Sequence, residues 1–109
     1  MATAELAVAI PSLLAVLVVA LSAVDLGLSQ VRCVDAARLG ARLVARAEPE
    51  SVVLKEVLRA APDGATVAVS LRGGLATVTV TAPGPAVVMA IGVIGPPRAT
   101  AVASLEMTR

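Results

Sequence analysis

Aromatic side chains and histidine are absent from this chain of 109 residues, which holds a single cysteine. The lack of histidine removes the side chain that most often acts as a general base near neutral pH and binds metal ions. One cysteine excludes an internal disulfide framework and a cysteine-rich zinc site. With a net charge of +1 and no rings to stack on bases, nucleic acid is not expected as a partner. We therefore expect a protein that is not an enzyme, with no cofactor, no metal and no small-molecule substrate.

Charged residues are also scarce, at 16%, whereas 58% of the residues are hydrophobic and the mean hydropathy is +0.92. Such a composition is typical of a protein with a membrane segment. The run from Leu6 to Val24 carries no charge, and as a helix it would be about 28 Å long, close to the hydrocarbon thickness of a bilayer. Residues 1–24 are therefore predicted to form a single transmembrane helix. Pro11 is tolerated within it if a neighbouring group such as the Ser12 hydroxyl satisfies the carbonyl that the proline leaves free.

The fate and the orientation of this helix have alternative interpretations. A secretory signal cleaved near Ser22 would release a small secreted binding module, but the first residues lack the basic side chains that such signals carry. The basic residues that follow the span place the C-terminal part in the cytoplasm by the positive-inside rule. That orientation reverses if a basic leader preceded the chain at insertion. The residues concerned are Arg32, Arg38, Arg42 and Arg46.

The predicted helix continues beyond the membrane as an amphipathic segment over residues 25–47. Its charged residues recur every three or four positions and leave an opposite face of small side chains. Small residues four apart allow a second helix or a sheet to approach closely, so we expect Ala37, Gly40 and Ala41 to serve assembly. The alternative is that an alanine-rich composition produces this spacing by chance. Cys33 lies on the same face, either as an intersubunit thiol or as a small buried residue.

The rest of the head, which is predicted to span residues 25–109, contains a second helix and about three strands. Apolar positions at helical spacing predict a helix over 50–61, and strict alternation around an Arg-Gly-Gly turn predicts a hairpin over 66–82. A last strand is expected over 99–106. The apolar segment 82–98 is left open as a loop that packs on the membrane, on a partner or over the sheet. The fold class is therefore α+β, with a small antiparallel sheet. The positions expected to face inward from the second helix are Val53, Leu54, Val57, Leu58 and Ala61.

Two segments of the sequence carry a family resemblance. They read ATAELAVAIPSLLAVLVVALSAV, which includes Pro11, and QVRCVDAARLGARLVARAEPE, and the hairpin follows them. Together they resemble the TadE family of small pilins and pseudopilins from the Flp/Tad branch of type IV pili. The resemblance implies a structural minor pilin or pseudopilin with a pilin-like head, held in the bacterial cytoplasmic membrane by one helix, with the head outside and able to enter an extracellular pilus. Its partners would be other pilin subunits, the pilus assembly machinery and membrane lipid.

The same resemblance implies an assembly role for Glu5 and Pro11. In type IV pilins a glutamate at the fifth mature position is thought to meet the N-terminal amine of a neighbouring subunit, and Glu5 occupies that position here. An isolated carboxylate in hydrocarbon costs several kcal/mol, so it requires such a partner. The alternative is that Thr3 caps the helix and Glu5 lies in its first turn, where the helix dipole and the membrane surface tolerate an acid.

Overall fold

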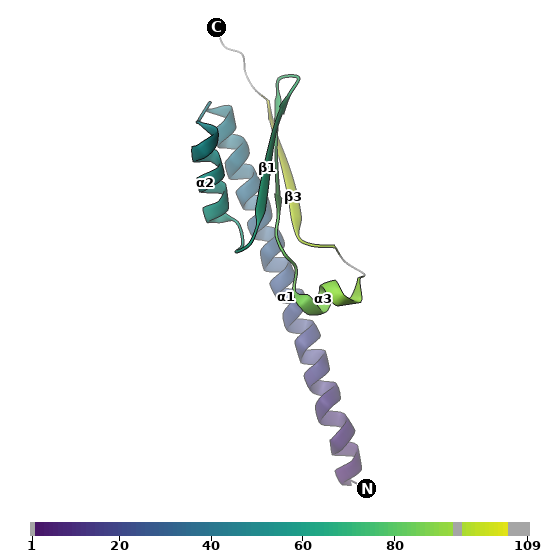
Figure 1. Cartoon of the computed structure of the whole chain (residues 1–109). Coiled ribbons are helices and arrows are strands. Elements are labelled where there is room, and N and C mark those ends of the chain that lie inside the picture. Colours follow the sequence, from purple (N-terminus) through teal and green to yellow (C-terminus); the bar gives the residue numbers. More distant parts are fainter. Residues whose placement is uncertain (1, 93–94, 105–109) are drawn as a thin grey trace.

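The computed structural model describes residues 2–92 and 95–104 of the chain. The molecule is elongated, 81 Å long, and consists of a helical rod with a small head packed along the second half of the rod (Figure 1). The predicted α+β class, with a long first helix, a short second helix and a three-stranded antiparallel sheet, is confirmed. The elements in chain order are α1 (Ala2–Ala45), α2 (Glu50–Ala60), β1 (Thr66–Arg72), β2 (Leu75–Thr81), α3 (Ala86–Ile91) and β3 (Arg98–Ser104).

Helix α1 runs without a break through the predicted boundary between residues 24 and 25, but its two halves differ in what covers them. Every side chain over residues 2–20 is exposed, including Leu13 at 69%. The buried residues of α1 all lie between Cys33 and Ala41. Leaving so much apolar surface in water is unfavourable. Within the described residues, α1 is the one helix long and apolar enough to cross a membrane.

Pro11 lies inside α1 and does not end it. Because proline has no N–H, the carbonyl of Ala7 loses its usual helical donor. The Ser12 hydroxyl was expected to replace that donor, but it does not bind the Ala7 carbonyl. It donates instead to the carbonyl of Val8, at 2.8 Å, so it reinforces a neighbouring position of the same turn.

The C-terminal end of α1 is capped by backbone hydrogen bonds. The helix ends at Ala45, two residues earlier than predicted. The N–H of Ala47 donates to the Val44 carbonyl at 2.9 Å, and the N–H of Glu48 donates to the Leu43 carbonyl at 3.1 Å. This pair of bonds is a Schellman motif, which satisfies carbonyls that a helix end leaves free. Ala47 adopts a φ of 63° to form it, a left-handed conformation that glycine usually supplies.

The sheet has the order β1-β2-β3, and both pairs are antiparallel. Strands β1 and β2 form the predicted hairpin, with Gly73 and Gly74 in its turn at φ of 58° and 80°. Positive φ at both positions gives a turn whose twist matches that of the flanking strands. The register pairs Val69 with Val78, so the valines of the two strands share the face that covers α1, as the alternation predicted.

The core forms where α2 and the sheet close over the small-residue face of α1. Val53 and Val57 of α2 are buried and Leu54 is half-buried, as predicted. Leu58 is 48% exposed, so its predicted inward position is wrong. It lies about 100° around the helix from Val57, and a helix that packs with one narrow face leaves such a position in solvent. The buried cluster is Cys33, Ala36, Ala37, Val53, Val57, Ala61, Val78, Val80, Ala82 and Ala99.

The segment between the hairpin and the last strand contains a short helix, α3, where the sequence indicated only an apolar loop. Strand β3 begins at Arg98, one residue earlier than expected, and is described up to Ser104. Its alanines face α1, and its alternate positions are exposed. The expected continuation to Glu106, and the apolar pair 93–94, lie outside the described residues.

Candidate functional site

The ionisable side chains of the described residues do not converge on a site. No group of three or more histidine, cysteine, aspartate or glutamate residues lies close enough to hold a metal ion in the part of the chain that the structure describes. The same part buries no charged or polar side chain. The ion pair between Arg59 and Glu56, at 3.8 Å, lies on the exposed side of α2 and is of a kind that adds little stability. Within these residues the geometry offers no acid–base pair and no ligand cage.

Glu5 and Pro11 lie in the uncovered half of α1. Glu5 is exposed in the first turn of the helix, where the helix dipole stabilises an acidic side chain. Thr3 lies inside the helix, because α1 already includes Ala2, so its predicted capping role is wrong. Neither Glu5 nor Pro11 contacts the head, since the buried part of α1 begins only at Cys33.

Ala37, Gly40 and Ala41 lie beneath the head of their own chain. All three are buried. A Cβ atom added at Gly40 would stand 2.8 Å from Cγ2 of Val57 and 2.8 Å from Cγ1 of Val78, which is shorter than atoms of this kind approach. The small residues therefore allow α2 and the sheet of the same chain to pack close to α1. This surface is occupied in the folded head.

The side chain of Cys33, on α1, is completely buried beneath the segment that leads into β3. Its Sγ lies 3.9 Å from the carbonyl oxygen of Pro97, to which the thiol donates. Burial raises the pKa of the Cys33 thiol, and a backbone hydrogen bond from Ala82 partly opposes the shift. A buried thiol with a raised pKa reacts slowly, so the structure places Cys33 as a packing residue of the head.

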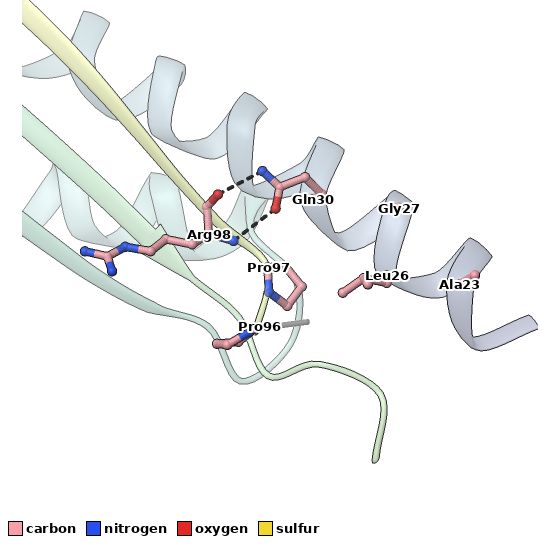
Figure 2. Close-up of a pocket in the computed structure, with 8 residues that line it drawn as sticks. Ala23, Leu26, Gly27, Gln30, Pro96, Pro97 and Arg98 are labelled. Carbon is pink, nitrogen blue, oxygen red and sulfur yellow. Dashed lines mark hydrogen bonds between the residues drawn. The ribbon is translucent and has the colours of Figure 1, made fainter. Parts of the chain in front are cut away.

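A groove of about 490 Å³ lies where the apolar run of α1 ends beside the entry to β3. One bidentate contact spans it: the side-chain amide of Gln30 donates to the carbonyl of Arg98 at 2.8 Å, and the N–H of Arg98 donates to the Gln30 oxygen at 3.0 Å. Figure 2 shows Leu26 pointing from α1 towards Pro97, and the Arg98 side chain directed away from α1. The lining residues are Ala23, Leu26, Gly27, Gln30, Gly95, Pro96, Pro97 and Arg98.

The sequence reasoning missed this groove. Gln30 and Arg98 are separated by 68 positions, and the group that Gln30 binds is the backbone, which has no signature in the sequence. The available signal was a long uncharged polar side chain, Gln30, within a stretch of α1 that is otherwise made mainly of small and apolar residues. It could indicate a contact at Gln30 but could not name the partner.

The comparisons with known proteins include a relative with a similar sequence. No family model and no solved structure matches the chain. The chain is similar to a protein of Mycobacterium tuberculosis (strain ATCC 25618 / H37Rv) named Apoptosis inhibitor Rv3655c, with 46% identity over 79 residues. These residues are 72% of this chain and 62% of the relative, so the chain spans less than two thirds of the relative's length. Wherever an uninterrupted match of this length begins, it includes the chain from Cys33 to Val78.

These comparisons contradict the resemblance to the TadE family. The relative is named for the inhibition of apoptosis, and no family model supports a pilin. The predicted function as a minor pilin or pseudopilin is therefore wrong. The resemblance depended on short segments rich in alanine and valine, and the physical demand for small and aliphatic residues is common to many membrane helices. The expected pilin partners depended on that resemblance alone.

Proposed function

We propose that this protein is a membrane-anchored inhibitor of apoptosis, with α1 as a single-pass anchor and the head as the part that acts. The observation that carries the proposal is the 46% identity to the protein named Apoptosis inhibitor Rv3655c. An uninterrupted match must include the end of α1, all of α2 and the first strand of the hairpin. The end of α1 and α2 together supply half of the buried cluster, which favours a common head fold in the two proteins.

The head acts by binding rather than by catalysis in this proposal. The chain has no histidine, and the described residues hold no cluster of three or more potential metal ligands and no buried charged side chain. A catalytic side chain usually needs a perturbed environment. The carboxylates of the described part of the head lie at the surface, with Glu56 half-buried.

The proposed location is a bacterial cytoplasmic membrane, with the head outside. The exposed apolar half of α1 supports a membrane anchor. An outward head gives the protein access to a cell whose apoptosis it inhibits. The positive-inside rule favours the opposite orientation, because Arg32, Arg38, Arg42 and Arg46 follow the span. Protease treatment of intact spheroplasts decides between the two, since only an outward head is digested.

The function is tested by expressing the full chain in cultured cells and inducing apoptosis with a chemical stimulus. We expect lower caspase activity and a larger surviving fraction than in cells with an empty vector. A matched control is Gly40→Val, which forces a branched side chain into the contact with Val57 and Val78 and leaves the apolar half of α1 unchanged. Equal caspase activity in cells that express the native chain, the control and no chain would overturn the proposal.

A further inference from the structure

Helix α3 lies at the base of the head, beside the part of α1 where the apolar run ends (Figure 1). The chain that follows it, Gly95–Arg98, lines the groove together with α1 residues from Ala23 to Gln30. At the rise of an α-helix, Gly27 stands about 4.5 Å beyond Val24, the last residue of the apolar run, and Gln30, at the upper limit of the groove, about 9 Å beyond it. The headgroup layer on each side of a bilayer is about 5–8 Å thick. When α1 spans a bilayer, the base of the head therefore lies at the level of the lipid headgroups.

The α3 side of this base is uncharged, whereas the α1 side carries the exposed Asp25 directly after the apolar run. The sequence from Ala82 to Pro97 contains no charged residue. On α3 itself Ala86 and Ala90 are exposed, and Ile91 is 58% exposed. Exposing the apolar side chains of such a helix to water is unfavourable in free energy, whereas the boundary between headgroups and acyl chains favours an apolar surface.

We propose that α3 is a membrane foot that inserts into the bilayer spanned by α1, so that the head rests on the membrane at two points. This inference depends on the proposed anchoring role of α1. The occupant is lipid because the exposed surface of α3 is next to the end of the apolar run of α1, and the two surfaces are both apolar. Arg98, the next charged residue, directs its side chain away from the membrane-spanning end of α1 (Figure 2), so the foot itself carries no charge.

The contact between Gln30 and Arg98 fixes the position of this part of the head along α1. It joins α1 to the start of β3 by two hydrogen bonds, directly after the segment that follows α3. A second contact holds the start of the segment, because the N–H of Ala82 donates to the carbonyl of Pro97 at 3.0 Å. Insertion of α3 therefore sets the orientation of the whole head relative to the membrane surface.

The test uses the full chain in vesicles of phosphatidylcholine and phosphatidylglycerol, with Cys33 replaced by alanine and one nitroxide label at a time. The labels replace Val16 in the apolar half of α1, Ile91 in α3, and Leu71 near the hairpin turn. Collision with dissolved oxygen and with a water-soluble nickel chelate is measured for each. We expect the Ile91 label to collide with the chelate several-fold less often than the Leu71 label, and to approach the values of the Val16 label.

The three labels separate the two proposals. Chelate access at Val16 equal to that at Leu71 would overturn the anchor itself. Protection at Val16 combined with full access at Ile91 would overturn the foot and leave the anchor intact. A second variant places the label at Ala90 and adds Ile91→Asp, which introduces a charge that is costly in the membrane. We expect several-fold higher chelate access at Ala90 in this variant than with Ile91 present, with an unchanged circular dichroism spectrum, and unchanged access would count against the foot.

Discussion

Gln30 binds the main chain of Arg98 through both ends of its side-chain amide, at 2.8 and 3.0 Å. Arg98 is the first residue of β3, which is an edge strand of the sheet. The free edge of a strand presents unpaired N–H and C=O groups, and the Gln30 amide satisfies one of each at the point where the chain enters the strand. A side chain of α1 thus fixes where β3 begins, next to the end of the apolar run.

The replacement Gln30→Ala removes this contact. We expect a loss of about 1 kcal/mol in the free energy of unfolding, because two hydrogen bonds are lost at a site where water can replace them. Hydrogen exchange at the Arg98 amide should accelerate. The matched control is Arg98→Ala, since Gln30 binds only the backbone of that residue. Slow exchange at position 98 in Gln30→Ala, or fast exchange in the control, would contradict the assignment.

Gly40 is the position where α1 comes closest to the rest of the head. We expect Gly40→Ala to destabilise the protein by about 1–2 kcal/mol, because the added Cβ forces Val57 and Val78 to move and this cost exceeds the gain in helix propensity. Gly27→Ala is the control, because nothing lies within 4 Å of an added Cβ there. Thermal unfolding in detergent micelles should show a lower midpoint for the first variant and an equal or higher midpoint for the second.

The hairpin and the inward face of the sheet could be predicted because each depends on neighbours in the sequence. Alternating valines define the face, and two consecutive glycines define the turn. Helix α3 could not be predicted, because prolines and glycines surround it and it has no polar face that would reveal a helical period. Leu58 was misplaced for a related reason. Its spacing fits a helix, but the width of the buried face depends on how α1 and β1 pack against α2.

The end of α1 offers a stabilising substitution. Ala47 has a φ of 63°, which costs a residue with a Cβ about 1–2 kcal/mol, and glycine avoids that cost at some loss of entropy. We expect Ala47→Gly to raise the free energy of unfolding by about 0.5–1 kcal/mol. Ala45→Gly, two residues earlier within the helix, should lower it by a similar amount. Chemical denaturation of the two variants side by side gives the comparison, and equal signs would refute the role of the Schellman motif.

Cys33 makes the stability of the head depend on pH in the alkaline range. Burial raises the pKa of its thiol in the folded chain, so above about pH 8.5 the unfolded thiol loses its proton first and the unfolded state binds fewer protons. The free energy of unfolding should therefore fall as the pH rises through this range, and the Cys33→Ala variant should lack this contribution.

In native conditions a maleimide should label Cys33 slowly, whereas Val31→Cys in the Cys33→Ala background should react quickly, because position 31 is 58% exposed. Rapid labelling of the native thiol would show that the entry to β3 opens from α1 far more readily than its buried contacts imply.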